Sequence, residues 1–174
     1  MKSLRISWKG NVREGFVRIK YTENGKQDLD LIAPLWEKLR EHQRLRSLHF
    51  PGHYAARTWQ ARKADLMRKS RSGGLHLHIA TDLDTREPIG YCVSTVSGNG
   101  QGQLESIYVE PDYRKCGVGD RLMRRALNWM DVMHARTKTL TVGVGNEEVL
   151  SFYRRYGFYP KHITVEQVKT GEGD

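Results

Sequence analysis

Alternating apolar and polar positions mark strands near the N-terminus and in the middle of the chain. The segment Phe16–Thr22 alternates in this way, as expected of a strand with one buried face. The same period of two returns in Leu75–Thr81, Ile89–Ser97 and Gln103–Val109, which are separated by short runs of turn-forming residues. Three strands joined by such turns predict an antiparallel meander.

Other stretches carry apolar residues at the spacing of a helix. They are Asp30–Arg46, Tyr54–Lys69, Gly117–His134 and Glu147–Tyr156, and the third has the strongest apolar stripe. Gly157 follows the last of them in the position of a C-terminal glycine cap.

Two more apolar runs, Thr139–Val144 and Ile163–Val168, predict strands. The full order is then β-α-α-β-β-β-α-β-α-β. This order predicts an α/β protein of the α+β type, with a mixed, mainly antiparallel central sheet flanked by helices. A length of 174 residues suits a single domain, and we expect residues 170–174 to form a loose tail.

The composition is that of an ordinary globular protein. Hydrophobic residues make up 38% and charged residues 28% of the chain, which excludes a disordered or low-complexity protein. No apolar run approaches the length of a membrane-spanning helix, and the N-terminal segment lacks the apolar core of a secretory signal. Two cysteines, Cys92 and Cys116, are too few for a disulfide framework. We therefore expect a cytoplasmic protein with no membrane partner.

Basic residues outnumber acidic ones by 29 to 20, and the excess is unevenly distributed. Residues 36–71 carry ten basic and three acidic side chains, residues 72–113 one basic and six acidic, and residues 114–138 seven basic and two acidic. Basic blocks attract anions such as phosphorylated cofactors, nucleic acids or acidic partners. A pair of solvated helices would produce the same pattern.

The segment with the most distinctive chemistry, Val109–Gly119, lies between a predicted strand and a predicted helix. Gly117 and Gly119 allow a sharp turn and a close approach of the backbone to a ligand. The first turn of the helix presents unpaired N–H groups and the positive end of the helix dipole, and Arg114 and Lys115 add charge. These features predict a phosphate or pyrophosphate site, although similar turns also occur in purely structural roles.

Metal binding is not predicted from the histidines. His49 and His53 are four residues apart, but the Pro-Gly pair between them argues against one helical face. His76 and His78 fall on one face of a predicted strand and are interpreted as ordinary surface or core histidines. No set of residues has the ligand spacing of a metal centre.

Three motifs resemble the GNAT superfamily of acetyl-CoA-dependent N-acetyltransferases. Arg114-Lys115-Cys116-Gly117-Val118-Gly119 is similar to its Arg/Gln-x-x-Gly-x-Gly/Ala pyrophosphate loop, and Ile107–Pro111 is similar to the usual lead-in. Asn146 follows a predicted strand where the family has an asparagine, and Phe152–Phe158 is similar to the ending Phe/Leu-Tyr-x-x-x-Gly-Phe. The element order also agrees. The resemblance implies a single N-acetyltransferase domain over residues 1–174, with its core at about 14–168.

The resemblance further implies that acetyl-CoA is the co-substrate and that backbone N–H groups after Arg114 hold its pyrophosphate. The pantetheine arm would lie beside the strand Gln103–Val109 as an added strand. The backbone from Ile107 to Val109 would bond pantetheine and polarise the thioester carbonyl. Asp120 departs from the pattern, since a carboxylate near a pyrophosphate is unfavourable, and we expect it to point away. The implied cofactor-binding residues are Ile107, Tyr108, Val109, Arg114, Lys115, Cys116, Gly117, Val118, Gly119, Asp120 and Asn146.

The implied reaction is direct attack of an amine on the thioester. Tyr153 is the implied acid, since a tyrosine hydroxyl is protonated at neutral pH and can donate to the departing sulfur; the alternative is a core aromatic. Glu105 is the candidate base, acting through a water, and its alternative is an outward-facing strand residue with a salt-bridge partner. Water alone as the base stays open. Cys116 is interpreted as a structural residue rather than a nucleophile.

In the family, the first two helices and their connection form one wall of the acceptor site, here Trp36–Arg71. Its basic side chains favour a small-molecule or peptide amine of acidic character. The alternative is an acyl-CoA-binding or RNA- or ribosome-associated module of the same fold, which modifies a protein or lacks activity. Nucleic-acid binding is not expected, because no RNA-binding signature is present. The acyl chain length and a homodimer stay open.

Overall fold

The computed structural model describes residues 4, 5 and 16–168. The chain divides into two compact units. The first consists of the described residues up to Leu39 together with Thr58–Thr141, and the second of Arg40–Arg57 together with the described residues from Val142. The single domain expected from the length stays a prediction, and the loose tail expected over 170–174 lies outside the described residues.

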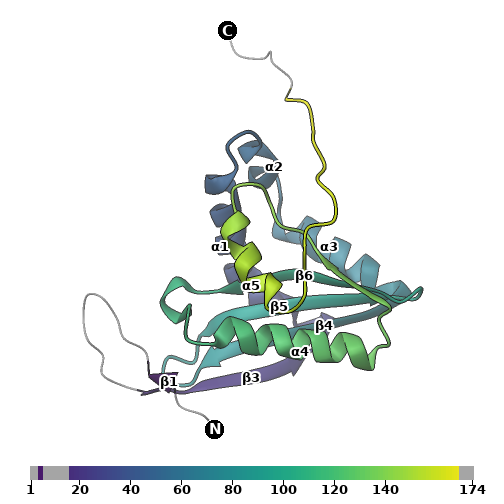
Figure 1. The fold of residues 1–174 in the computed structure, drawn as a ribbon. Helices are drawn as coiled ribbons and strands as arrows, with labels where there is room; N and C mark the ends of the chain where they lie inside the picture. The colour runs from purple at the N-terminus through teal and green to yellow at the C-terminus, as the bar shows by residue number, and fades with distance from the viewer. Residues whose placement is uncertain (1–3, 6–15, 169–174) are drawn as a thin grey trace. The chain divides into compact units, whose positions relative to one another are not determined.

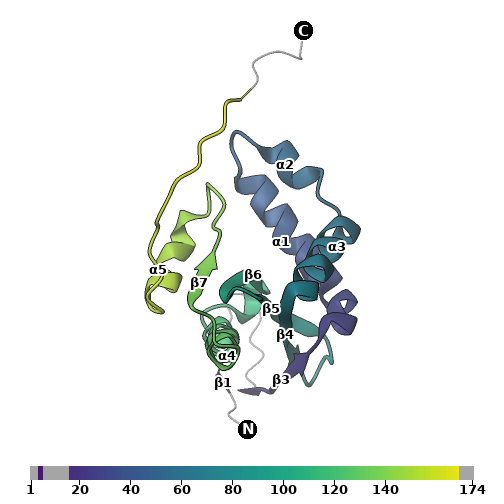
Figure 2. The ribbon, with the colours of Figure 1, turned by 90° about the vertical axis from the view of Figure 1, so that its right-hand side faces the viewer.

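The first unit is built on a five-stranded sheet in the order β3-β4-β5-β6-β7, whose last strand is labelled in Figure 2. Figure 1 shows the other four strands and α4 (Val118–Val132) lying along them. All neighbours are antiparallel except β6 and β7, which are parallel. The predicted meander is therefore confirmed, as is the mixed, mainly antiparallel sheet. Its strands are β3 (Ile19–Asn24), β4 (Gly73–Asp82), β5 (Pro88–Ser97), β6 (Gln101–Val109) and β7 (Thr137–Leu140). A separate ladder joins β1 (Leu4–Arg5) to β2 (Phe16–Val17).

The helices follow the predicted order with additional breaks. The predicted helix Asp30–Arg46 is a 3₁₀ segment followed by α1, and the predicted helix Tyr54–Lys69 is split into α2 and α3. The split lies before Thr58, whose side chain accepts a hydrogen bond from the Ala61 N–H at 3.2 Å and caps α3. The helical segments are η1 (Lys26–Ile32), α1 (Ala33–Arg46), α2 (Pro51–Ala55), α3 (Trp59–Lys69), η2 (Ser70–Ser72), η3 (Pro111–Tyr113), α4 (Val118–Val132), η4 (Glu147–Val149) and α5 (Leu150–Arg154).

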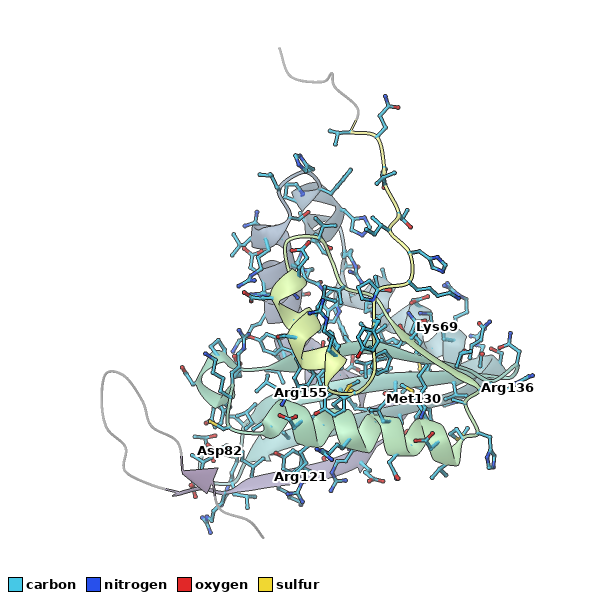
Figure 3. All side chains as sticks on the ribbon, viewed as in Figure 1. Lys69, Asp82, Arg121, Met130, Arg136 and Arg155 are labelled. Atoms are coloured by element: carbon cyan, nitrogen blue, oxygen red, sulfur yellow. The ribbon has the colours of Figure 1, made fainter. Side chains whose placement is uncertain are left out.

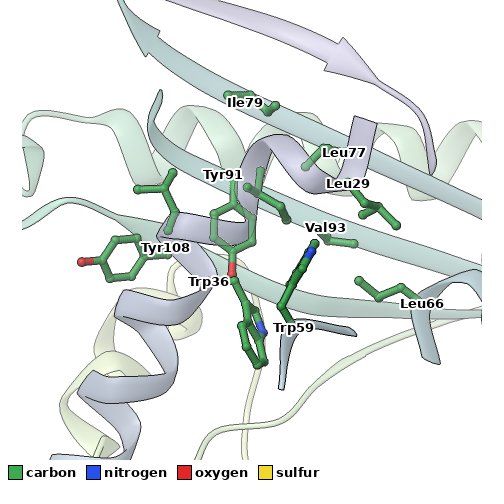
Figure 4. Packing of buried hydrophobic residues seen from close by; sticks show 11 residues of the cluster. Leu29, Trp36, Trp59, Leu66, Leu77, Ile79, Tyr91, Val93 and Tyr108 are labelled. Carbon is green, nitrogen blue, oxygen red and sulfur yellow. The ribbon is translucent and has the colours of Figure 1, made fainter. Parts of the chain in front are cut away.

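Apolar side chains cover both faces of the sheet in the first unit. Figure 2 shows α3 and α4 on opposite sides of the strands. On the α3 side, Trp36 and Trp59 pack with ring centroids 5.6 Å apart within a buried cluster (Figure 4). On the α4 side, the strong apolar stripe of that helix is buried, as its period predicts. Its buried residues are Val118, Leu122, Met123, Ala126 and Met130.

The predicted strand Ile163–Val168 is wrong. Residues 161–168 form no regular secondary structure, and Ile163 and Val165 are 85% and 88% exposed. The alternation of apolar residues is genuine, but a strand requires a ladder partner, and this segment has none among the described residues.

The predicted strand Thr139–Val144 is also displaced, because β7 begins at Thr137 and ends at Leu140. The following residues pack inside the second unit. Gly145 has a positive φ of 89°, and a Cβ built on it would lie 2.1 Å from the Arg46 carbonyl oxygen. The glycine is therefore required for a close approach to the end of α1.

Among the described residues, none of the helices combines the length and the apolar composition needed to cross a bilayer.

Candidate functional site

The edge of β6 is open along half of its length. Its ladder with β7 runs only from Gln101 to Leu104, so residues 105–109 have no strand partner on that side among the described residues. The Glu110 N–H donates to the Ile89 carbonyl on β5 at 2.9 Å. Because backbone groups point to alternate sides of a strand, the N–H and C=O groups of Ile107 and Val109 face the open edge.

A β-bulge lies where this open edge begins. The pairing of β5 with β6 shifts between Val93, which faces Ser106, and Ser94, which faces Leu104. Glu105 is thus the extra residue on β6. Bulges bend a strand and increase its twist, which is consistent with the loss of pairing to β7 at this point.

The loop after β6 leads its backbone into the start of α4. Lys115 and Gly117 have positive φ values of 61° and 80°, and Gly117 is the N-cap residue, with no side chain to cap the helix. A Cβ on Gly117 would meet nothing within 4 Å, so conformation rather than space favours glycine here. Successive N–H groups in such a loop and in a first helical turn form a concave site for an anion. We call the segment Lys115–Asp120 the amide cradle.

Side chains outside the cradle anchor the loop that leads to it. The Tyr113 hydroxyl donates to Asp82 Oδ2 at 2.7 Å, and Asp82, labelled in Figure 3, is buried. Burial raises the pKa of Tyr113, and the hydrogen bond and charge of Asp82 raise it further, so this hydroxyl remains a donor. The same carboxylate accepts the Asp84 N–H at 2.8 Å, which ties the loop to the turn between β4 and β5.

Two further side chains of the loop bond to the backbone. Arg114 Nε donates to the Val109 carbonyl oxygen at 2.9 Å. Cys116 Sγ donates to the Arg114 carbonyl oxygen at 3.3 Å. Burial raises the pKa of the Cys116 thiol, which disfavours the thiolate needed for a nucleophile. This supports the structural interpretation of Cys116.

Glu105 is held by three donor groups. Its Oε1 accepts the Thr95 hydroxyl at 2.8 Å and Lys69 Nζ at 2.8 Å. Its Oε2 accepts Arg62 Nη2 at 3.0 Å and Lys69 Nζ at 2.9 Å. The Glu105 side chain is 1% exposed; Lys69, on α3, is labelled in Figure 3. The burial contradicts the outward-facing residue considered from the sequence, whereas the salt-bridge partner of that alternative is present on α3.

Asn146 and Tyr153 belong to the second unit. Asn146 precedes η4, and its Oδ1 is buried with no hydrogen-bond partner among the described residues. Tyr153 lies on α5, half-buried, with its ring centroid 5.3 Å from that of Phe152. The Gly157 and Phe158 N–H groups bond the Arg154 and Tyr153 carbonyls at 3.0 and 3.3 Å, so α5 ends in a Schellman motif at Gly157, as the predicted cap requires.

Comparison with known proteins bears directly on this arrangement. The model of the acetyltransferase (GNAT) family matches residues 36–158, which include β6, the amide cradle and α5. The chain belongs to the GNAT acetyltransferase family. The resemblance inferred from the sequence motifs is therefore confirmed.

Two curated relatives of this GNAT protein are known from sequence. An N-acetyltransferase of Methanocaldococcus jannaschii is 29% identical over 83 residues, which are 44% of this chain and 37% of the relative. The peptidyl-lysine N-acetyltransferase YjaB of Escherichia coli is 32% identical over 72 residues, 41% of this chain and 42% of the relative. The matches thus span less than half of each of these relatives.

Solved structures agree in fold with this GNAT protein. The aminoglycoside N-acetyltransferase AAC(6')-Iy in complex with CoA has a TM-score of 0.61 at 18% identity, covering 91% of this chain and 99% of that one. A GCN5-related N-acetyltransferase from Ralstonia eutropha has a TM-score of 0.67 at 16% identity, covering 88% and 100%. At these identities the likeness shows the fold alone.

Sequence reasoning about this GNAT protein missed the anchors of its loop and of Glu105. Tyr113 and Asp82 are 31 residues apart and Glu105 and Lys69 are 36 apart, so no local pattern joins them. The acidic block 72–113 and the basic block 36–71 were the available signal, since their opposite charges indicated pairing between them.

Proposed function

We propose that this protein transfers an acetyl group from acetyl-CoA to a primary amine of a small molecule or peptide, by direct attack within a ternary complex. The observation that carries the proposal is the open edge of β6, which leads directly into the amide cradle. The two features supply, in order along the chain, a backbone edge for an extended polar arm and a concave set of N–H groups for a diphosphate.

In this proposal the cradle binds the CoA pyrophosphate through the N–H groups of Lys115 to Asp120. The pantetheine arm adds to β6 at the N–H and C=O of Ile107 and the N–H of Val109. The Val109 carbonyl is assigned to Arg114, whose hydrogen bond to it is consistent with closing the end of the added strand. A backbone N–H at this edge also polarises the thioester carbonyl as negative charge develops on its oxygen.

The chemical step forms one C–N bond and breaks one C–S bond. The neutral amine attacks the thioester carbon, the tetrahedral intermediate collapses, and the CoA sulfur departs. Tyr153 donates its hydroxyl proton to the sulfur, the proton lost by the amine passes to solvent, and the Tyr153 phenolate regains a proton from solvent before the next turnover. Holding both substrates together accounts for a large part of the catalysis, because the amine and the thioester then react within one complex in a fixed orientation instead of meeting by diffusion.

Asn146 is assigned to the pantetheine arm. A buried amide oxygen without a partner costs free energy, and Asn146 Oδ1 is such an atom among the described residues. An amide N–H of pantetheine is a matching donor, so this orphaned oxygen supports the role implied by the family motif.

Glu105 is retained as the candidate base, but its contacts favour water as the immediate proton acceptor. Thr95, Arg62 and Lys69 already donate hydrogen bonds to the two carboxylate oxygens of Glu105. A water molecule would have to compete with these donors for the same oxygens. If Glu105 relays the proton, Glu105→Gln lowers kcat at pH 7 by about a hundredfold. A kcat within a few-fold of the wild type would assign the proton to solvent alone.

The acidic acceptor expected from charge receives little support within the first unit. There Arg62, Lys63 and Lys69 each form ion pairs with carboxylates, which leaves less net charge for an acceptor. The same pairing weakens the argument for an RNA- or ribosome-associated module. We therefore propose a primary amine as the acceptor without specifying its charge. The proposed location remains the cytoplasm.

The test is CoA binding by calorimetry in two matched glycine variants. Gly117 and Gly157 have nearly equal positive φ values, 80° and 78°, and a Cβ on either meets nothing within 4 Å. Alanine therefore adds similar backbone strain at both. Gly117→Ala should weaken CoA binding about tenfold or more, since a 1.4 kcal/mol loss is tenfold, and Gly157→Ala should leave CoA affinity unchanged. Wild-type protein that gives no heat with CoA, or equal affinities in all three proteins, would contradict the proposal.

A further inference from the structure

A pair of histidines lies on the face of β4 that packs against α4. His76 and His78 are two residues apart on the strand, and their ring centroids are 4.5 Å apart. His76 also stacks on Trp129 of α4 at 5.2 Å and an interplanar angle of 24°. The His78 side chain is 2% exposed, against 19% for His76. The pair is therefore sandwiched between a strand and a helix rather than displayed on a loop.

Glu23 completes a three-residue cluster across the strand boundary. It is the register partner of His78 in the β3–β4 ladder, and such cross-strand neighbours on one face have Cβ atoms about 5 Å apart. Glu23 Oε2 lies 3.8 Å from His76 Nε2, and Glu23 Oε1 lies 3.7 Å from His78 Nε2. One ligand atom from each of the three residues can be chosen so that all lie within 4.8 Å of one another.

We propose that Glu23, His76 and His78 form a Zn²⁺ site that joins β3 to β4 beneath α4. Two imidazole nitrogens and a carboxylate oxygen are a recognised zinc ligand set, with bonds of about 2.0 to 2.2 Å. Two atoms bound to one tetrahedral ion at those lengths are about 3.4 Å apart. The distance from His76 Nε2 to Glu23 Oε2 is 3.8 Å, and the three ligand atoms all lie within 4.8 Å of one another. Small side-chain rotations close the set, and a water or substrate atom takes the fourth position. This site is separate from the proposed acetyl transfer.

Hydrogen bonding leaves one ring nitrogen of the pair unsatisfied among the described residues. His78 Nδ1 is buried with no hydrogen-bond partner among the described residues, so hydrogen bonding at this atom does not explain why the ring is buried.

Arg125 is the charged neighbour that limits the affinity. Its Nη1 donates to Glu23 Oε1 at 2.9 Å, which leaves Oε2 available as the metal ligand. Donors that bond the second oxygen of a ligating carboxylate orient it for the ion. The guanidinium charge also repels a cation, so we expect a dissociation constant in the micromolar range rather than that of a closed structural zinc site.

The experiment titrates Zn²⁺ into untagged full-length protein by competition with a chromophoric chelator, and repeats the titration in three variants. Glu23→Gln and His76→Gln each remove one ligand at a position that is not fully buried. His49→Gln, at an exposed histidine outside the cluster, is the matched control. Thermal unfolding with and without Zn²⁺ gives a second readout, since a ligand of the native state raises Tm.

The proposal expects one Zn²⁺ per chain for the wild type and for His49→Gln, with a rise in Tm. Each ligand variant should bind at least about tenfold more weakly, the lower end of what even outer-shell changes cost in metal sites, and should lose the rise in Tm. Absence of saturable binding by the wild type would overturn the site. Equal binding by His76→Gln would overturn it as well.

Discussion

At the residue scale, the side chain of Arg114 does not extend the amide cradle. Its Nε bonds the Val109 carbonyl, and its guanidinium carbon lies 5.6 Å from the centre of the Tyr108 ring. The basic side chain that a charge pattern assigns to phosphate is thus folded against the end of β6. The proposed anion binding at this loop therefore rests on N–H groups, which the positive φ values of Lys115 and Gly117 orient.

Tyr153→Phe removes a single oxygen from the proposed acid. We expect kcat to fall about a hundredfold, the lower end of what general acids contribute. The dissociation constant of CoA should change little, because the departing sulfur is the only CoA atom assigned to this hydroxyl and the proposed affinity comes from the amide cradle and the β6 edge. Pre-steady-state release of free thiol separates the chemical step from product release. Tyr159→Phe, at a tyrosine that is 72% exposed, is the control and should retain full activity. Unchanged kcat in Tyr153→Phe would remove the acid assignment.

At the scale of elements, ion pairs tie β6 to α3. Glu105 on the bulge of β6 bonds Arg62 and Lys69, and Asp65 on α3 pairs with the same two cations at 3.1 and 3.6 Å. The basic excess of α3 is therefore partly neutralised by the acidic block of the sheet. A block of charge in the sequence becomes a contact between two elements rather than a charged surface.

Glu105→Gln leaves two cations around a neutral amide. Because the Glu105 side chain is 1% exposed and that of Arg62 10%, solvent cannot replace the lost charge, and we expect the free energy of unfolding to fall by on the order of 3 kcal/mol. Urea unfolding at pH 7 measures it. Glu41→Gln, which breaks the solvent-exposed pair with Arg44, should change stability much less. Equal losses of unfolding free energy in the two variants would show that the buried ion pairs stabilise the fold no more than the exposed pair does.

At the scale of the molecule, the sheet of the first unit is buried on both faces, and this has a consequence for pH. Cys92, on β5, is fully buried, and burial raises the pKa of its thiol to about 12, against which a contact with Ser94 acts only weakly. Unfolding exposes the thiol, and its pKa then returns to about 8.5. The unfolded chain therefore loses a proton in alkaline solution that the folded chain keeps.

Cys92 should therefore make its full contribution to the free energy of unfolding below pH 8.5. That contribution should be lost progressively as the pH rises from 8.5 toward 12. The slope from this one group approaches 1.4 kcal/mol per pH unit. Urea unfolding between pH 8 and pH 10.5 tests this in the wild type and two variants. Cys92→Ala should lower stability at every pH through the cavity but show a shallower alkaline decline. Cys116→Ala, at the half-buried loop cysteine, should keep most of the wild-type slope. Parallel curves for all three would contradict the assignment.

The sequence by itself determined the strands of the meander, the long helix α4 and the family. Period-two alternation and the apolar stripe of α4 report burial on one face, which is a local property of the chain. The loop from Arg114 to Gly119 was equally readable, because left-handed turns and helix starts impose residue types at fixed spacing. The His76 and His78 pair was also visible on one strand face, but not its third member.

Only the tertiary structure decided which residues meet across the fold. Strand register places Glu23 opposite His78, packing of α3 on the sheet brings Lys69 to Glu105, and the short ladder of β7 leaves the edge of β6 open. The wrong prediction of a strand at Ile163–Val168 has the same cause. Its alternation is typical of a strand, but the described residues contain no neighbouring strand to pair with it. Periodicity shows which side of an element is buried, whereas partners depend on contacts between residues that are distant in the chain and have no local signature.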